Sequence, residues 1–383
     1  MALHFERSEY QDRIDTARTA LDAQGLDGIL MFAQESMYYL TGYDTFGFCF
    51  FQCLYLGSDG TVALLTRLPD LRQAQHTSIL EDIRVWTDER AARPEIQLRD
   101  MLEDLGARGT RLGIEYDSYG LTAHAGKAVD SALEGFCTLE DASQLISRIR
   151  VVKSAAELVY VRRAGELGDA SLQAGLDATA AGADEGEILA AMQGAVFAGG
   201  GDYPGNEFII GSGRDALLSR YKSGRRKLSA KDQLTLEFAG VCHHYHAALM
   251  RTVIIGEPEP EHVRMFDAAH DALLACEAEL VPGKTAGDVF DAHARVMDDA
   301  GLRDHRMNAC GYCLGAKFSP SWMDWPMFYH GNEAEIGPGM VFFVHMILMD
   351  SVSGNAMTLG RTYIVTGEGV EQLAKHPLEL YVK

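Results

Sequence analysis

The chain has few basic residues and no long apolar runs. Its 383 residues include 34 Lys and Arg against 55 Asp and Glu, which gives a formal net charge of −21. A nucleic acid or an anionic membrane surface would repel this charge, so neither is expected as a partner. No run approaches the ~18 apolar residues of a transmembrane helix, and Met1–Tyr10 lacks the apolar core of a signal peptide. We therefore expect a cytoplasmic protein.

Cysteine is also too sparse and scattered for a disulfide framework. The seven cysteines are an odd set, and several lie in apolar runs. Buried free thiols in a reducing compartment fit this pattern better than disulfides. Cys310–Cys313 matches CxxC, but no second CxxC accompanies it. We therefore expect neither a zinc nor a redox site there.

The length and composition indicate two globular domains. Hydrophobic residues make up 47% and charged residues 23% of the chain, which is typical of a folded protein that is long for one core. Alternating helical and strand patterns predict an α/β domain over residues 1–150. Its elements are expected near residues 8–25 (helix), 29–32 (strand), 53–66 (hairpin), 98–105 (helix), 111–114 (strand) and 120–133 (helix).

A second domain is predicted over residues 151–383. Ser154 and Glu157 form a capping-box pattern that begins a long amphipathic helix. Strands then come in pairs, with helices grouped between them. This order predicts an α+β domain built on a curved antiparallel sheet.

The candidate chemistry is concentrated in the predicted hairpin of residues 236–252. Glu237, His243, His244 and His246 lie within ten residues of one another, and these are the groups that move protons or attack electrophiles near neutral pH. A carboxylate among apolar neighbours is costly unless it is paired or functional. Glu237 is therefore either catalytic or bonded to backbone or Arg. His244 and His246 are expected to share a strand face, but a turn prevents strand parity from deciding which histidine meets Glu237.

Several segments resemble the pita-bread family of creatinase, prolidase and methionine aminopeptidase. Lys153–Glu157, Arg251-Thr252 and Pro338–Phe342 are similar to that family's domain entry, hairpin end and late strand entry. The resemblance covers nearly the whole chain. It implies a creatinase-like N-terminal domain, a pita-bread C-terminal domain and a homodimer.

The resemblance also implies a site without metal. Metal-dependent members hold two ions with two Asp, one His and two Glu, which activate a bridging water. Carried over position by position, these ligands fall on Glu237, Ala248, Tyr312, His345 and Gly360. Ala and Gly offer no ligating side chain, and two remaining ligands do not make a dinuclear site. We therefore expect neither a metal nor another cofactor.

The metal-free ectoine hydrolase branch is the best fit. Gly201–Pro204, Glu237–Gly240 followed by Tyr245-His246, and Gly311–Gly315 followed by Trp322 resemble its motifs. This likeness implies that Glu237 attacks a cyclic amidine in a small zwitterion. His246 would carry the proton, with His244 and His345 as further candidates. One departure is Gly360, where that branch keeps an acidic residue.

Substrate contacts are expected from two arginines and from aromatic residues. Arg220 stands where creatinase-like relatives use His, and either Arg220 or Arg251 would clamp a carboxylate. Arg251 is equally compatible with a structural ion pair. Aromatic faces suit a delocalised cation, although core or dimer packing explains them as well. The aromatic candidates are Tyr312, Trp322, Trp325 and Phe48, and Phe48 could serve across a dimer interface.

Two other functions remain open at this level. A metal-dependent Xaa-Pro peptidase has the same architecture, and two bound ions per chain would identify it. A catalytically inactive binding protein would also lose the ligand positions described above. Turnover and binding measurements on small zwitterions separate these alternatives.

Overall fold

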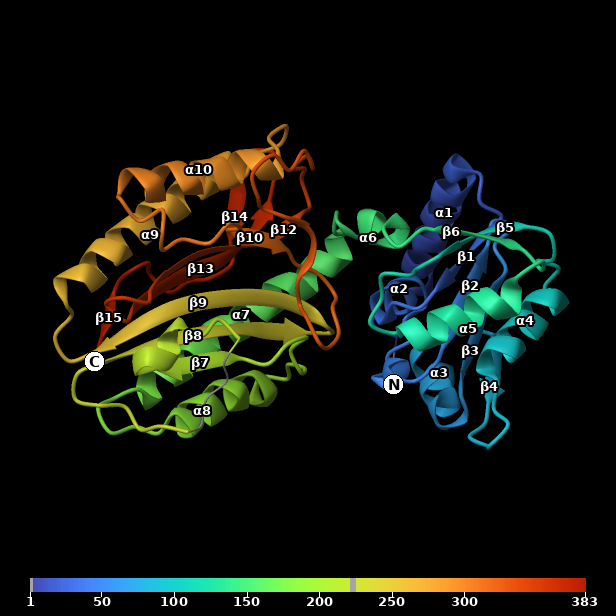
Figure 1. Ribbon diagram of the computed structural model, residues 1–383, viewed down its shortest axis with the longest axis horizontal. Coiled ribbons are helices and arrows are strands. Elements are labelled where there is room, and N and C mark those ends of the chain that lie inside the picture. The colour runs from blue at the N-terminus through green and yellow to red at the C-terminus, as the bar shows by residue number, and fades with distance from the viewer. Residues whose placement is uncertain (1–2, 221–224) are drawn as a thin grey trace. The chain divides into compact units, whose positions relative to one another are not determined.

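The computed structural model describes residues 3–220 and 225–383 of the chain (Figure 1). Backbone contacts divide it into two compact units, Met1–Arg150 and Val151–Lys383. The fold is α+β, with a mixed sheet in the first unit and a large antiparallel sheet in the second.

The N-terminal unit is built on a six-stranded sheet of order β4-β3-β2-β1-β5-β6. Two antiparallel steps, β1–β2 and β2–β3, are flanked by parallel pairs on both sides. The strands are β1 (Gly28–Met31), β2 (Cys53–Gly57), β3 (Val62–Arg67), β4 (Asp82–Trp86), β5 (Arg111–Ile114) and β6 (Thr138–Asp141). The helices are α1 (Arg7–Gln24), α2 (Gln34–Thr41), η1 (Gly47–Cys49), η2 (Leu68–Asp70), α3 (Leu71–Thr77), α4 (Pro94–Asp104), α5 (Ala123–Leu133) and α6 (Leu145–Arg150).

The C-terminal unit is built on a nine-stranded sheet with the main order β11-β10-β12-β13-β9-β8-β7. Strand β14 pairs with β13, and β15 pairs with β9. The strands are β7 (Ile209–Ser212), β8 (Asp232–Cys242), β9 (Tyr245–Ile255), β10 (Gly311–Cys313), β11 (Asp324–Met327), β12 (Val341–Asp350), β13 (Asn355–Val365), β14 (Val370–Gln372) and β15 (Tyr381–Val382). The helices are α7 (Ala155–Ala178), α8 (Glu185–Ala198), η3 (Gly213–Leu217), α9 (Pro260–Glu279) and α10 (Ala286–Asp299).

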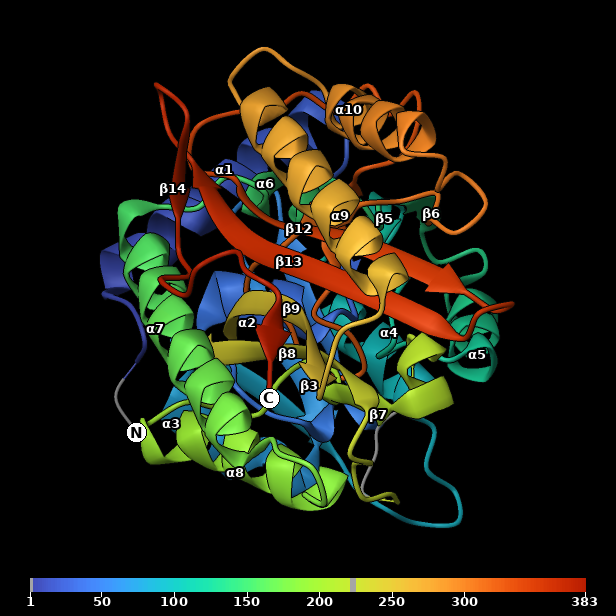
Figure 2. The same ribbon diagram turned by 90° about the vertical axis from the view of Figure 1, so that its left-hand side faces the viewer.

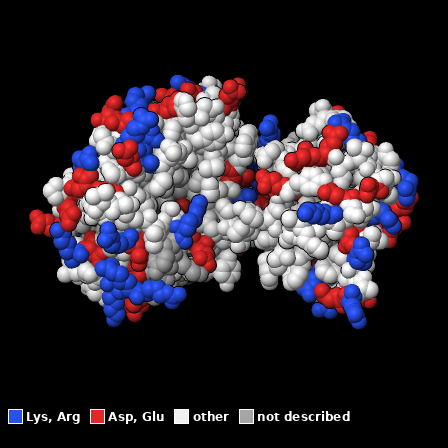
Figure 3. All heavy atoms as spheres, in the orientation of Figure 1, with Lys and Arg blue, Asp and Glu red and all other residues white. Residues whose placement is uncertain are grey.

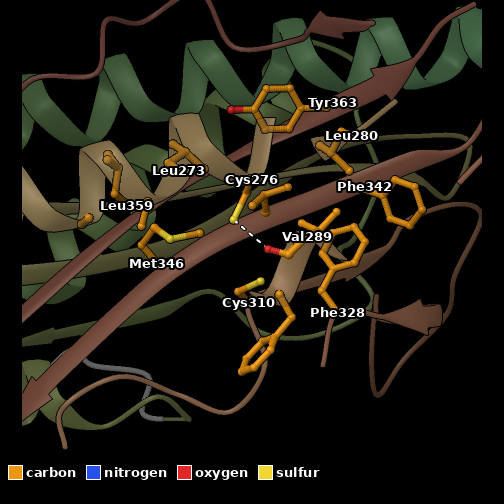
Figure 4. Packing of buried hydrophobic residues seen from close by; sticks show 14 of the residues in the cluster. Leu273, Cys276, Leu280, Val289, Cys310, Phe328, Phe342, Met346, Leu359 and Tyr363 are labelled. Atoms are coloured by element: carbon orange, nitrogen blue, oxygen red, sulfur yellow. Dashed lines mark hydrogen bonds between the residues drawn. The ribbon is translucent and has the colours of Figure 1, made fainter. Parts of the chain in front are cut away.

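The four long helices of this unit cover one face of the sheet. Figure 2 shows α7, α8, α9 and α10 in front of the strands. Alternate residues of β12, such as Phe342, Val344 and Met346, join the hydrophobic cluster formed with α9 and α10. Figure 4 shows its packing, with the Cys276 thiol donating to the carbonyl oxygen of Val289 at 3.4 Å. Side chains alternate along a strand, so the residues between these point to the opposite face, which we call the inner face.

The start of α7 confirms the predicted capping box. The Ser154 hydroxyl accepts from the backbone N–H of Glu157, and the Glu157 carboxylate accepts from the backbone N–H of Ser154. Glu157 also accepts from the hydroxyl of Tyr245 at 2.8 Å. The cap therefore fixes α7 against the first residue of β9.

Surface charges form local pairs of both signs. On the face drawn in Figure 3, basic side chains lie interspersed with acidic ones. Arg162 and Glu371 approach to 2.8 Å, and Arg264 and Glu261 to 2.6 Å. Exposed pairs of this kind contribute about 0–1 kcal/mol each, so the buried clusters carry most of the stability.

All seven cysteines are free thiols. Within residues 3–220 and 225–383, no helix is both long and apolar enough to cross a membrane.

Gly240 allows α7 to lie directly on β8. A Cβ atom at this position would stand 1.9 Å from the carbonyl oxygen of Ala164 and 2.3 Å from the nitrogen of Gly168, both on α7. Backbone atoms cannot move aside as the end of a side chain can. The close helix–sheet contact therefore requires glycine here.

We predict that Gly240→Ala lowers the free energy of unfolding by about 3 kcal/mol or more, because overpacking of a rigid contact is costly. The control is Gly194→Ala, since nothing lies within 4 Å of an added Cβ there and Ala is favoured over Gly in a helix by up to about 1 kcal/mol. Urea unfolding measures both changes. A Gly240→Ala protein as stable as the wild type would contradict this account of the α7–β8 contact.

Candidate active site

The β8–β9 hairpin carries Glu237 near its middle and turns at His243 and His244. Both turn residues have positive φ, 48° and 65°, as a two-residue turn that follows the sheet twist requires. The His244 ring stacks on Phe318 with the ring centroids 4.1 Å apart. The prediction that His244 shares a strand face with His246 is therefore wrong, because His244 belongs to the turn and only His246 belongs to β9.

The strand register aligns a row of residues across the inner face. Glu237 pairs with Met250, Met250 with Gly360, and Gly360 with His345. Directly opposed residues in antiparallel strands point to the same face. Tyr312 pairs with Phe343, two residues before His345, so it points the same way. Strands β8, β10 and β12 thus bring a carboxylate, a phenol and an imidazole to one face.

Glu237 is the buried carboxylate of this row. It is only 6% exposed. Burial raises its pKa from 4.5 to about 7, while the charge of Arg220 and a hydrogen bond from Tyr312 act in the opposite direction. The Tyr312 oxygen in turn accepts from Nε1 of Trp322 at 2.8 Å. A carboxylate in this setting changes protonation near neutral pH and can act as a nucleophile or base.

His345 lies beside this carboxylate network. Its ring centroid is 5.6 Å from that of Tyr312 and 5.3 Å from that of Phe343. Burial lowers its pKa to about 3, so the ring is neutral at pH 7. Among the described residues, its Nδ1 atom has no hydrogen-bond partner. A buried polar atom of this kind normally has a partner, and a substrate or water is a suitable one.

His246 is also buried on the inner face, but both of its ring nitrogens are engaged. Nε2 accepts from the backbone N–H of Gly205 at 2.8 Å, and Nδ1 lies 3.4 Å from the carbonyl oxygen of Gly315. Burial lowers its pKa to about 3. These contacts fix the tautomer with the proton on Nδ1. As it stands, His246 supports the backbone around it and has no ring nitrogen left for a substrate proton.

The two predicted arginine anchors lie in different places. Arg220 is exposed, and its charge acts on Glu237, Tyr312 and His345. A cation therefore lies near enough to act on all three groups. Arg251 pairs with Leu236 and Leu359 and therefore points to the opposite face.

The Arg251 side chain is used structurally. Its Nη1 donates to the carbonyl oxygens of Met250 and Gly360, at 2.8 and 2.7 Å. The expectation that Arg251 clamps a substrate carboxylate is therefore not retained, because strand register directs it away from Glu237. This orientation could not be inferred before the register was known.

The remaining aromatic candidates also lie in different places. Trp322 is buried and joins the network through Tyr312. Trp325 packs instead against the cluster formed with α9 and α10. Phe48 lies in η1 of the N-terminal unit, so its contact with substrate stays a prediction.

The five positions that the family resemblance assigned to metal ligands all lie on the inner face. They are Glu237, Ala248, Tyr312, His345 and Gly360. Burial raises the pKa of the Tyr312 phenol well above its usual range, which favours the neutral phenol. Among residues 3–220 and 225–383, no group of three or more His, Cys, Asp or Glu side chains is placed to hold a metal ion.

The space at Gly360 is filled by a neighbouring ring. A Cβ atom at Gly360 would stand 2.7 Å from Cε2 and 2.9 Å from Cζ of Phe343. Phe343 thus occupies the volume that a ligating side chain on β13 would need. The residues present do not fit a dinuclear metal centre. Phe343 was missed from the sequence, although a glycine at a predicted ligand position signals that a bulky neighbour covers it.

Comparison with known proteins agrees with this architecture. Residues 13–152 match the model of the creatinase/prolidase N-terminal domain, and residues 159–367 match that of metallopeptidase family M24. The chain is 28% identical to the ectoine hydrolase of Halomonas elongata, over all of this chain and 99% of that protein. It is 21% identical to the Xaa-Pro dipeptidase of Pyrococcus furiosus, over 97% of this chain and 99% of that one.

A solved structure shows the same fold. The prolidase of Thermococcus sibiricus superposes with a TM-score of 0.88 over 98% of this chain and 99% of that chain, at 18% identity. The pita-bread architecture expected from the resemblance is thereby confirmed. Because the family model covers more than half of its length, the chain belongs to metallopeptidase family M24 and is a hydrolase of that family.

Proposed function

We propose that this hydrolase opens a C–N bond in a small non-peptide zwitterion, with a cyclic amidine such as ectoine as the lead substrate. One observation carries the proposal. A buried carboxylate, Glu237, and a neutral phenol, Tyr312, lie on the inner face at positions where the family pattern expects metal ligands. The 28% identity to an ectoine hydrolase supports the same substrate class.

Glu237 acts as the nucleophile in this proposal. Its oxygen adds to the amidinium carbon, and the C=N electron pair moves onto a ring nitrogen. Water then displaces the Glu237 oxygen, the C–N bond breaks, and the leaving nitrogen takes up a proton. One water is consumed, and Glu237 returns as a carboxylate.

The neighbours of Glu237 suit the other parts of such a substrate. Neutral His345 presents an unpartnered Nδ1 that can accept a proton from the attacking water. Phe343 and Met250 line the row between Glu237 and His345, and their apolar surface suits the ring carbons. Arg220, which is exposed, would hold the substrate carboxylate.

Three further parts belong to the proposal: the enzyme works without a bound metal, acts in the cytoplasm, and is a homodimer. The misfit of Ala248, Gly360 and Phe343 to a metal centre supports the first. Phe48 and its neighbours in the N-terminal unit would complete the partner's site.

We predict that Glu237→Gln lowers kcat by at least about 1,000-fold, because the amide has no nucleophilic oxygen. Turnover is measured on a panel containing ectoine-like cyclic amidines, acyclic amides and Xaa-Pro dipeptides. In the wild type, kcat/KM should rise with pH through about 7, as Glu237 ionises. A mutant that keeps more than about a tenth of wild-type kcat would exclude the nucleophile role.

The same substitution should stabilise the fold above pH 7. Burial disfavours ionised Glu237 in the folded state, so the contribution of Glu237 to stability is greatest below pH 4.5 and is lost as pH rises through about 7. The pKa difference of about 2.5 corresponds to about 3 kcal/mol as an upper figure. Urea unfolding at pH 8 and pH 4 tests this. A Glu237→Gln protein less stable than wild type at pH 8 would contradict the burial argument.

We predict different effects for the two inner-face histidines. His345→Gln should lower kcat by roughly 10²–10⁴-fold at little change in Tm, since it removes a proton acceptor. His246→Gln should mainly lower Tm, because His246 bonds to backbone on both sides. Paired kcat and Tm measurements distinguish the two. The opposite result would make His246 the proton carrier. In that case His246→Gln would have a much lower kcat at an unchanged Tm, and His345→Gln would keep the wild-type kcat.

A further inference from the structure

The ring of Phe343 lies directly against Gly360. A Cβ atom at Gly360 would stand 2.7 Å from Cε2 and 2.9 Å from Cζ of this ring, and 3.0 Å from Cβ of Met250. Non-bonded carbon atoms normally keep about 3.5–4.0 Å apart, so a side chain at Gly360 and the ring cannot share this space. A glycine inside a strand often marks such a close approach. Phe343 and Gly360 are therefore a complementary pair.

Phe343 is held in this position by its neighbours. The side chain is fully buried. Its ring centroid lies 5.6 Å from that of Tyr312 and 5.3 Å from that of His345. Interior side chains that are packed in this way leave little room for movement. The ring is thus a fixed boundary beside His345.

The pair lies in the middle of the row that carries the candidate chemistry. The order across the strands is Glu237, Met250, Gly360 and His345. Strands lie about 4.8 Å apart, so roughly 14 Å of sheet separates the backbones of Glu237 and His345. A molecule that contacts both of these side chains must lie over Met250 and Gly360. The ring of Phe343 therefore bounds its space on the side of the sheet.

We propose that Phe343 is a specificity-determining residue, whose ring against Gly360 restricts the site to a small single-ring substrate and excludes larger ones. The inference rests on the proposed function, in which the substrate lies between Glu237 and His345. An apolar boundary discriminates by size, and one methylene group changes kcat/KM by about 10–200-fold. The ring has no group that could move a proton, so its role differs from that of His345.

The test is a size series of cyclic amidine carboxylates, measured on the full-length protein. The amidine carbon carries a methyl, ethyl or propyl group, and a further member has a ring that is one carbon larger. Phe343→Leu removes the outer ring atoms that cover Gly360. Relative to the methyl compound, kcat/KM for the larger members should rise about tenfold or more over the wild-type ratio. Adding Gly360→Ala to this variant should lower the ratio again, because the new methyl group refills the space.

Phe342→Leu is the matched control. Phe342 precedes Phe343 on β12 and is also fully buried, but it belongs to the hydrophobic cluster on the opposite face. The control should lower Tm and leave the order of preference unchanged. Tm is measured for every variant. An equal change of preference in Phe342→Leu would show general loosening of the fold and overturn the assignment to Phe343.

A stability cycle tests the pair without any substrate. Gly360→Ala should lower Tm in the wild type, because the added Cβ meets the ring. It should lower Tm much less in Phe343→Leu, since residues in contact are not additive. A Gly360→Ala protein that fails to fold, while the double variant folds, gives the same answer. Equal effects in the two backgrounds would overturn the complementary pair.

The outcomes separate this proposal from the proposed function. The same size series is run on acyclic amides, and Kd replaces kcat/KM for compounds that bind without turnover. A coupled pair with an unchanged order of preference overturns the specificity role and leaves the proposed function standing. A shift of size preference on acyclic amides, in a protein that turns over no cyclic amidine, upholds Phe343 and rejects the substrate class.

Discussion

Burial of one carboxylate is the constraint on which the site depends. Glu237 lies on β8 among apolar neighbours, and this environment raises its pKa to about 7. An ionised carboxylate there needs compensation. The hydroxyl of Tyr312 and the charge of Arg220 supply it. Because each comes from a different element, the hairpin, β10 and the segment after η3 must all be in place to compensate the charge of Glu237.

The same face shows where this chain departs from the ligand pattern of a metallopeptidase. Ala248 and Gly360 remove two ligating side chains, and Phe343 fills the space left above Gly360. Restoring a carboxylate at Gly360 alone would therefore clash with Phe343. The ligating side chains are therefore not simply missing, because Phe343 has filled the space that one of them would occupy. It leaves an apolar surface between a carboxylate and an imidazole, which suits a small ring better than a peptide.

The sequence predicted those features that depend on local pattern. The capping box at Ser154, the long helices and the β8–β9 hairpin follow from periodicity and end signals. Helix α2 was missed because all of its residues are buried, which removes the amphipathic signal. His244 was misplaced because a turn of this type usually carries Asn-Gly. The orientation of Arg251 and the hydrogen bond from Trp322 to Tyr312 depend on strand register and on a distant loop, and no local pattern encodes these.

Under the proposed function, Glu237 does the chemistry in a site that holds no metal pair. The most direct measurement is the metal content per chain and kcat, determined on the same sample before and after chelation and dialysis. We expect kcat to persist with fewer than about 0.1 ions per chain, since two ligands do not retain a dinuclear centre. Binding of about two ions per chain, with activity lost on their removal and restored by added manganese, zinc or iron, would contradict the claim.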